Sequence, residues 1–246
     1  MSIHPLAAAG FAQVADTYER GRPGYPDAAV DRLVAALPGR AVVDLGAGTG
    51  KLTRALVARG CDVVAIEPVA EMRAAITAPV RVRPGSAENT GLPAASADAV
   101  TIAQAFHWFN APLALAEIHR ILRPGGVLAL IWNQRQRYDS LQDRLCALLE
   151  PHCRKGTPVP EGAWRTAFTA TSLFESLHEE TFANEQVVDA AGLADQIRSI
   201  GYVASLHESE RSALLEEVCA LAGDGVVVVR YVVELQITTR CNWCGP

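Results

Sequence analysis

Residues 42–50 read Val42-Val43-Asp44-Leu45-Gly46-Ala47-Gly48-Thr49-Gly50. The apolar start is typical of a buried strand, and a loop with glycine at every second position follows it. Because glycine has no Cβ, such a loop lets backbone approach a ligand closely. A dinucleotide-binding loop needs the spacing G-x-G-x-x-G, but Lys51 and Thr53 stand where its last glycine would be. The spacing here, D-x-G-x-G-x-G, therefore predicts a ligand site of the Rossmann kind and disfavours NAD.

A second acidic residue supports a site for an adenosine-containing ligand. Residues 62–66 read as another strand, and Glu67-Pro68 follows it. Glu67 lies close to the offset of about 20 residues at which an acid binds the ribose hydroxyls in Rossmann folds. Dehydrogenases share this acid, so Glu67 alone does not choose between cofactors. Taken together with the glycine spacing, it disfavours NAD.

The rest of the chain alternates between strand and helix patterns. This alternation predicts an α/β fold with a Rossmann-like, doubly wound, seven-stranded sheet, mostly parallel with an antiparallel closing strand. Strands are expected at 41–45, 62–67, 80–83, 97–106, 127–132, 179–183 and 226–237, and helices at 51–59, 70–78, 113–122, 187–199 and 208–222. Ligands of such sheets bind at the carboxyl ends of the strands. We therefore expect one pocket to be surrounded by residues 44–50, 67–68, 85–88, 103–109 and 132–133.

The length of 246 residues fits a single domain over 1–246. We expect residues 1–40 to form an N-terminal cap or lid. Residues 134–175 contain helical fragments and the Pro/Gly-rich segment 156–162, so we expect a helical insertion there that covers the mouth of the sheet.

Composition excludes several classes of function. Half of the residues are hydrophobic, and the net charge of −5 disfavours nucleic acid as the main partner. The chain has neither a long apolar run nor the start of a signal peptide, so we expect a cytoplasmic protein without membrane partners, either monomer or homodimer. Cys241 and Cys244 have C-x-x-C spacing, but no second pair accompanies them, and no metal site is predicted.

Further motifs resemble a known family. Residues 18–26 are similar to a Y-x-x-x-R-P-x-Y-P segment, and matching stretches recur at 44–50, 67–68, 85–88, 103–109 and 122–126. Together they resemble the class I S-adenosylmethionine-dependent methyltransferases, in the small-molecule branch that includes trans-aconitate methyltransferase-like proteins. The resemblance covers residues 11–135. It implies S-adenosylmethionine as cofactor, S-adenosylhomocysteine as product, and in-line methyl transfer to a small organic acceptor, with oxygen as the favoured atom.

The resemblance also implies roles for individual residues. The cofactor would contact Tyr18, Arg22, Asp44, Gly46, Ala47, Gly48, Gly50, Glu67, Pro68, Met72, Ser86, Ala87, Glu88, Gln104 and Ala105. The substrate would contact Tyr25, Phe106, Trp108 and Trp132. His107 would act as general base or only orient the substrate. Many relatives carry aspartate where Ser86 stands.

Some alternatives stay open at this stage. Arg20 or Arg22 could pair with the carboxylate of the cofactor or with that of an acidic substrate. The chain could also bind the cofactor for a regulatory, non-methylating role, or be a Rossmann enzyme that uses NAD or a nucleotide sugar.

Overall fold

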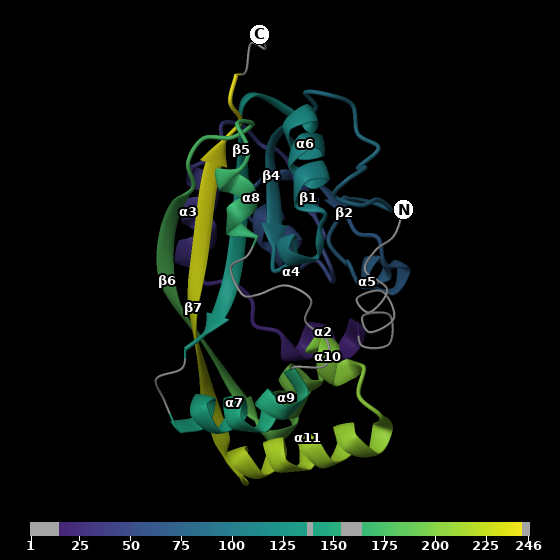
Figure 1. Ribbon diagram of the computed structural model, residues 1–246, viewed down its shortest axis with the longest axis vertical. Helices are drawn as coiled ribbons and strands as arrows, with labels where there is room; N and C mark the ends of the chain where they lie inside the picture. Colours follow the sequence, from purple (N-terminus) through teal and green to yellow (C-terminus); the bar gives the residue numbers. More distant parts are fainter. Residues whose placement is uncertain (1–14, 137–139, 154–163, 243–246) are drawn as a thin grey trace.

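The computed structural model describes residues 15–136, 140–153 and 164–242. Its centre is one seven-stranded sheet in the order β3-β2-β1-β4-β5-β7-β6 (Figure 1). The strands are β1 Ala41–Leu45, β2 Asp62–Ile66, β3 Arg81–Arg83, β4 Ala97–Ala103, β5 Leu122–Arg135, β6 His178–Asp189 and β7 Val226–Thr239. Strands β1 to β5 pair in parallel, and β7 is antiparallel to both β5 and β6. The predicted fold class is confirmed.

Helices cover both faces of the sheet, as its apolar strands require. On one face, α6 Ala111–Ile121 and α8 Arg165–Thr169 pack over alternate residues such as Val43 and Leu45. On the other face, α3 Asp27–Ala35 and α4 Lys51–Val57 pack over residues such as Val42. A short helix, α5 Ala70–Ala74, follows β2. The carboxyl edge of the central strands therefore lies between two hydrophobic cores, one on each face of the sheet.

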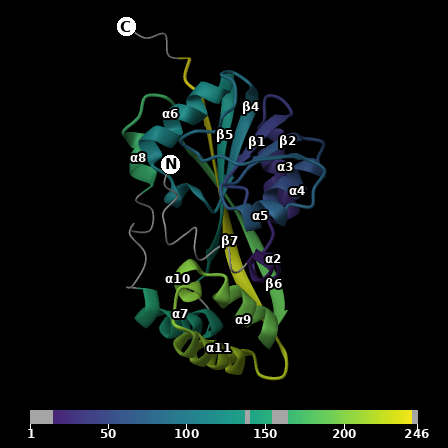
Figure 2. The same ribbon diagram turned by 90° about the vertical axis from the view of Figure 1, so that its right-hand side faces the viewer.

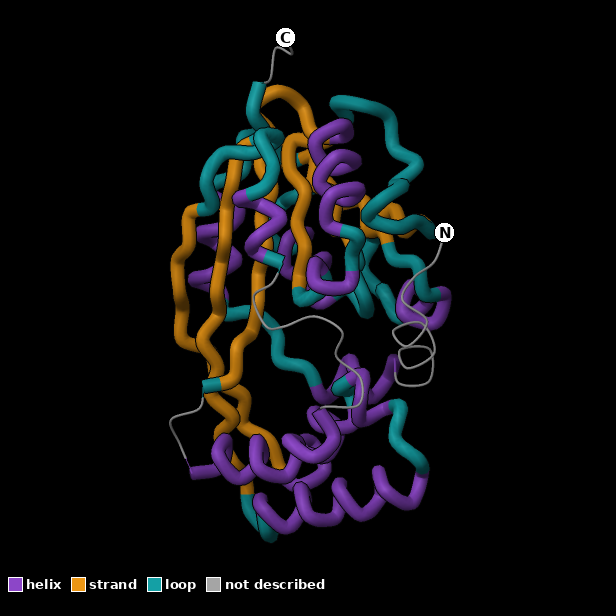
Figure 3. Tube along the Cα trace, viewed as in Figure 1, coloured by secondary structure: helices purple, strands orange, loops and turns teal. Residues whose placement is uncertain are grey.

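A helical lobe lies beyond the carboxyl edge of the central strands, at the bottom of Figure 1, and Figure 2 shows the same separation after a quarter turn. It contains α7 Ser140–Cys153, α9 Ala190–Arg198, α10 Gly201–Ala204 and α11 Glu208–Ala222. These helices share a core with Val188, Val229 and Tyr231 from the far ends of β6 and β7. Helix α2 Ala15–Gly21 packs on α9. The long strands thus carry the lobe, as the tube in Figure 3 makes plain.

The segment 134–175 divides between two places in the fold. Its helix α7 lies in the lobe, whereas α8 packs on the sheet through the buried Phe168. The lobe draws its other helices from 190–222, between β6 and β7. The Pro/Gly-rich segment 156–162 lies outside the described residues, as do Cys244 and the first fourteen residues of the expected N-terminal cap.

Several predicted element boundaries were wrong for local reasons. Strand β4 ends at Ala103 rather than residue 106, because Gln104 adopts a left-handed φ of 57° and a 3-10 helix, η1, follows over Phe106–Trp108. Strand β5 begins at Leu122, and residues 123–126 form an irregularity within it, with Gly125 at φ 74°. Strand β6 runs on to Asp189, whose side chain caps α9, so residues 187–189 are not helical.

Candidate active site

A cavity of about 340 Å³ lies between the glycine loop and the helical lobe. Its floor is the loop after β1, and its far wall comes from α7, α9 and β7. Of the predicted site residues, it brings together Tyr18, Arg22, Tyr25, Gly46, Ala47, Gly48 and Gln104. Its size is in the range that proteins use for small-molecule ligands.

The loop needs its glycines for backbone conformation. Gly46, Gly48 and Gly50 have φ of 65°, 57° and 84°, all in the left-handed region that other residues rarely adopt. A Cβ on Gly46 would lie 2.9 Å from the Cβ of Ala105, whereas one on Gly48 would meet nothing within 4 Å. The backbone of Gly48 is therefore exposed to the cavity. The small side chain of Ala105 allows the loop to pack closely at Gly46.

Glu67 is tied directly to this loop. Its Oε2 accepts a hydrogen bond from the Gly48 amide at 2.9 Å, and its Oε1 accepts one from the Val69 amide at 2.9 Å. Residue Glu67 is 6% exposed, and burial raises the pKa of its carboxylate, while the two amides lower it. Each oxygen keeps a further lone pair. Glu67 thus positions the loop and can still accept from a ligand hydroxyl.

Asp44 does not line the cavity. Its two oxygens accept from the hydroxyls of Thr53 at 2.6 Å and Thr101 at 3.0 Å, inside the core. Burial raises its pKa to about 6, against the opposing effect of these hydroxyls. The side chain therefore joins β1 to α4 and β4, and the structure gives it no direct path to a ligand in the cavity.

The N-terminal motif forms one side of the cavity. The Arg22 guanidinium lies over the ring of Tyr18, 5.3 Å from its centre, and Arg22 Nη2 donates to the Ser199 carbonyl at 3.2 Å. Arg22 Nε is buried without a partner. Burial, and then Tyr18 and Asp44, raise the pKa of Tyr25. Arg20 instead pairs with Asp195 at 2.8 Å and is exposed.

The predicted aromatic wall lies mostly in the sheet core. Phe106 is 1% exposed and packs against Trp164 and Phe168, with ring centres 6.0 and 5.3 Å away. Trp132 stacks on Trp164 at 5.4 Å. Neither lines the cavity. These aromatics position the end of β4 and do not form the cavity surface.

His107 lies beside these aromatics. Its ring centre is 4.7 Å from that of Trp108 and 5.6 Å from that of Trp132. Burial, and then the charge of Arg22, lower its pKa to about 4. The imidazole is therefore neutral at pH 7 and a weak proton acceptor.

The other predicted cofactor contacts lie near Glu67, away from the cavity lining. Met72 and Ala87 are buried, and Ser86 pairs with Asn89 in a tight turn. The carboxylate of Glu88 accepts from the Asn110 amide at 2.8 Å. Pro68 is half-buried and its carbonyl accepts from Arg73 at 2.6 Å. These residues surround the tips of β2 and β3.

Sequence reasoning missed the lobe side of the cavity. That wall is formed by Asn133, Gln134, Arg135, Cys146, Gln196, Ile200 and Tyr231, and the floor also includes Pro23, Thr49, Lys51, Leu52 and Ala103. Thr49, Ala103 and Asn133 do lie in stretches that were expected at the pocket, although β5 runs past Asn133 to Arg135. The remaining lobe residues lie on the extension of β5, on β7 and on helices whose packing no local pattern reveals.

Comparisons with known proteins agree with this geometry. A family model described as "Methyltransferase domain" matches residues 43–130. An uncharacterized methyltransferase of Mycobacterium tuberculosis is 39% identical over 212 residues, which cover 85% of this chain and 83% of that protein. The chain belongs to the class I S-adenosylmethionine-dependent methyltransferases. The methyltransferase uses S-adenosylmethionine and produces S-adenosylhomocysteine.

Another relative and a solved structure also match the methyltransferase. The malonyl-[acyl-carrier protein] O-methyltransferase of Dechloromonas aromatica is 35% identical over 130 residues, or 48% of this chain and 50% of that protein. A solved structure of a candidate type II methyltransferase from Anaeromyxobacter dehalogenans superposes with a TM-score of 0.63 at 24% identity, over 89% of this chain and 97% of that one. That likeness supports the fold.

In the described part of the chain, none of the helices is long and apolar enough to cross a membrane. Within the same residues, no group of three or more His, Cys, Asp or Glu side chains could hold a metal ion.

Proposed function

We propose that this methyltransferase transfers a methyl group to an oxygen of a small organic acceptor held in the cavity. The observation that carries the proposal is the cavity itself, which joins the glycine loop to a wall of polar side chains from the lobe. The motif at residues 18–26 supports a place in the small-molecule branch of the family, near the trans-aconitate methyltransferase-like proteins.

The residues at the loop fit S-adenosylmethionine. The bare backbone of Gly48 can approach its methionine part, and the Glu67 carboxylate can accept from the ribose hydroxyls. Arg22, whose buried Nε has no partner, can donate to the methionine carboxylate. Met72 and Ala87 would contact the adenine. Gly48 and Arg22 line the cavity, whereas Glu67, Met72 and Ala87 lie beside the tips of β2 and β3, outside its lining.

The chemistry needs little from the protein beyond position. The cofactor supplies a methyl group on a sulfonium, and the acceptor oxygen forms its bond to carbon as the carbon–sulfur bond breaks. The protein holds the acceptor in line and excludes water, which can provide much of the rate enhancement. An ionised carboxylate releases no proton when its oxygen is methylated, so it needs no base. With a pKa of about 4, His107 fits an orienting role better than a basic one.

The test is Glu67→Gln, measured by calorimetric titration with S-adenosylhomocysteine. The substituted amide has one acceptor oxygen for the two backbone donors and carries no negative charge. We expect affinity to fall by about 1–3 kcal/mol, or roughly 5- to 150-fold in Kd. Asp98→Asn is the matched control, because Asp98 accepts from the Ala41 amide at 3.0 Å outside the cavity. An equal effect of both variants would contradict the cofactor role of Glu67.

Transfer is then measured with methyl-labelled S-adenosylmethionine and a panel of small hydroxy and carboxylic compounds. Label in an alkali-labile ester or in an ether of the acceptor is expected. Label found only on nitrogen or carbon would contradict the choice of oxygen.

A further inference from the structure

The lobe side of the cavity contains a buried cation without an acidic partner. Arg135, the last residue of β5, donates from Nη2 to Gln196 Oε1 at 3.3 Å, and its Nη1 is buried with no hydrogen-bond partner. Gln196 is a neutral amide that also accepts from the Tyr231 hydroxyl at 3.1 Å. The Arg135 charge is therefore not balanced by any described side chain that bonds to it.

The surroundings increase this imbalance. Three cations line the cavity, Arg22, Lys51 and Arg135, and none of the described lining residues is Asp or Glu. Lys51 has an acidic neighbour, Glu19 at 3.4 Å, which it shares with Arg54 at 2.5 Å. Among the described residues, Arg22 and Arg135 have no carboxylate bonded to them. Burial lowers the pKa of Arg135, and repulsion by Arg22 lowers it further. An unpaired buried charge destabilises a fold, so a binding role is a physical reason to keep it.

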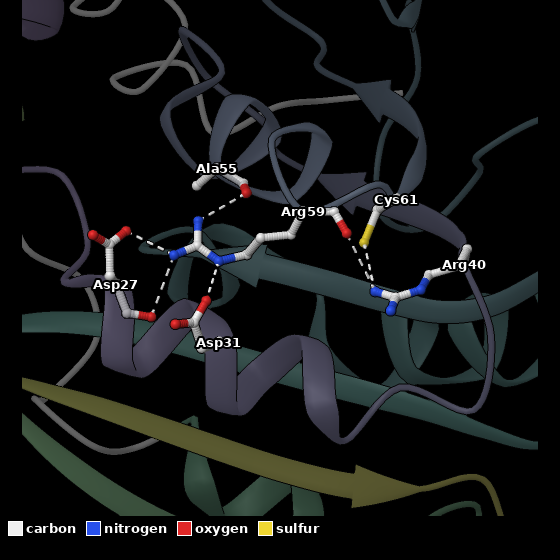
Figure 4. A network of polar contacts seen from close by, with 6 residues as sticks. All are labelled: Asp27, Asp31, Arg40, Ala55, Arg59 and Cys61. Atoms are coloured by element: carbon white, nitrogen blue, oxygen red, sulfur yellow. Dashed lines mark hydrogen bonds and ion pairs between the residues drawn. The ribbon is translucent and has the colours of Figure 1, made fainter.

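Other arginines of this chain show how it usually satisfies a guanidinium. Figure 4 shows Arg59, which donates from Nη2 to Asp27 at 2.7 Å and from Nε to Asp31 at 2.5 Å. Its Nη1 donates to the Ala55 carbonyl at 3.1 Å. Arg59 has two carboxylates outside the cavity, whereas Arg135 has none inside it.

We propose that Arg135, with Gln196 and Tyr231, binds a carboxylate of the methyl acceptor, so that the substrate is a small organic acid. This inference rests on the proposed function, in which Arg22 takes the cofactor's carboxylate. One cation then remains for one singly charged anion. A carboxylate matches the planar fork of a guanidinium, whereas a doubly charged phosphate would leave excess negative charge in the cavity.

The test uses the intact protein saturated with S-adenosylhomocysteine, so that the cofactor's carboxylate site is filled. Four monocarboxylates, propionate, butyrate, glycolate and benzoate, are titrated by calorimetry, each beside its amide. We expect at least one acid to bind tenfold or more tightly than its amide. Arg135→Met should abolish that preference, and Arg59→Met, the matched control, should retain it. Equal binding of acids and amides, or a preference that survives Arg135→Met, would overturn the inference.

A second measurement separates binding from a structural role. In urea unfolding without ligand, Arg135→Met should be as stable as the parent or more so, because it removes an unbalanced charge. Arg59→Met should be less stable. An unfolding midpoint of Arg135→Met that falls as far as that of Arg59→Met would assign Arg135 to the fold and overturn the inference.

The two proposals fail differently. If S-adenosylhomocysteine binds and the acids do not, the carboxylate inference is wrong and the proposed methyl transfer stands. If S-adenosylhomocysteine does not bind, both are wrong.

Discussion

At the scale of single residues, the site places two acids of the same predicted class in different roles. Glu67 accepts a hydrogen bond from the Gly48 amide of the glycine loop. Asp44 is buried and accepts from the hydroxyls of Thr53 and Thr101. The difference follows from position on the strands. Glu67 follows the last residue of β2, and Asp44 lies one residue inside β1, where its side chain faces α4. A carboxylate beside the glycine loop can therefore serve the fold instead of the ligand.

Asp44 gives a pH-dependent prediction. Its pKa of about 6 in the folded protein exceeds the ordinary value of 3.8, so the folded state holds more protons between these limits. Stability should therefore fall as pH rises from about 4 to about 6, and the buried charge should cost about 3 kcal/mol above that window. Asp44→Asn removes the titration and can still bond to both hydroxyls. Its stability relative to the parent should be greater at pH 7 than at pH 4.

Urea unfolding at these two pH values measures the difference. A gap between variant and parent that is the same at both would show that Asp44 does not titrate in this range.

At the scale of elements, the cavity wall depends on how closely α2 approaches α9. A Cβ on Gly21 would lie 2.5 Å from the carbonyl carbon of Asp195 and 2.7 Å from the amide nitrogen of Gln196. These are backbone atoms that cannot rotate away. Tyr18 lies on α2 and Arg22 directly follows it, and both line the cavity. The distance between α2 and α9 therefore sets the position of these two side chains.

Gly21→Ala should therefore push α2 away from α9. We expect a loss of about 1–3 kcal/mol in the free energy of unfolding, together with weaker binding of S-adenosylhomocysteine. Gly24→Ala is the matched control in the same segment, because a Cβ on Gly24 would meet nothing within 4 Å. Unfolding and calorimetry on both variants check this. Similar values for the two would mean that the α2–α9 contact does not set the cavity.

At the scale of the whole molecule, the cavity lies between the sheet and the lobe, so a bound ligand contacts both. S-adenosylhomocysteine at 100 times its Kd should stabilise the fold by about 2.7 kcal/mol. For a chain of this length that corresponds to a rise in Tm of roughly 5–10 °C. Hydrogen exchange should slow in α2 and α9 as well as in the glycine loop. Protection confined to the loop would contradict binding between the two parts.

The sequence by itself determined the sheet and the glycine loop. Val42–Gly50 combines a buried strand with left-handed glycines, and both are local properties of backbone and side chain. The position of Glu67 directly after β2 was local as well, since the end of a strand can be located from nearby residues. The class of fold, the family and the cofactor followed from these short stretches.

Only the tertiary structure decided the other half of the cavity. Arg135, Gln196 and Tyr231 come from β5, α9 and β7, and they meet because the long strands carry the lobe back over the loop. No local pattern encodes that meeting. The burial of Asp44 and Phe106 was likewise a result of packing between distant elements. Local chemistry specified the strands and the loop, whereas long-range packing decided which charges remain unpaired around the cavity.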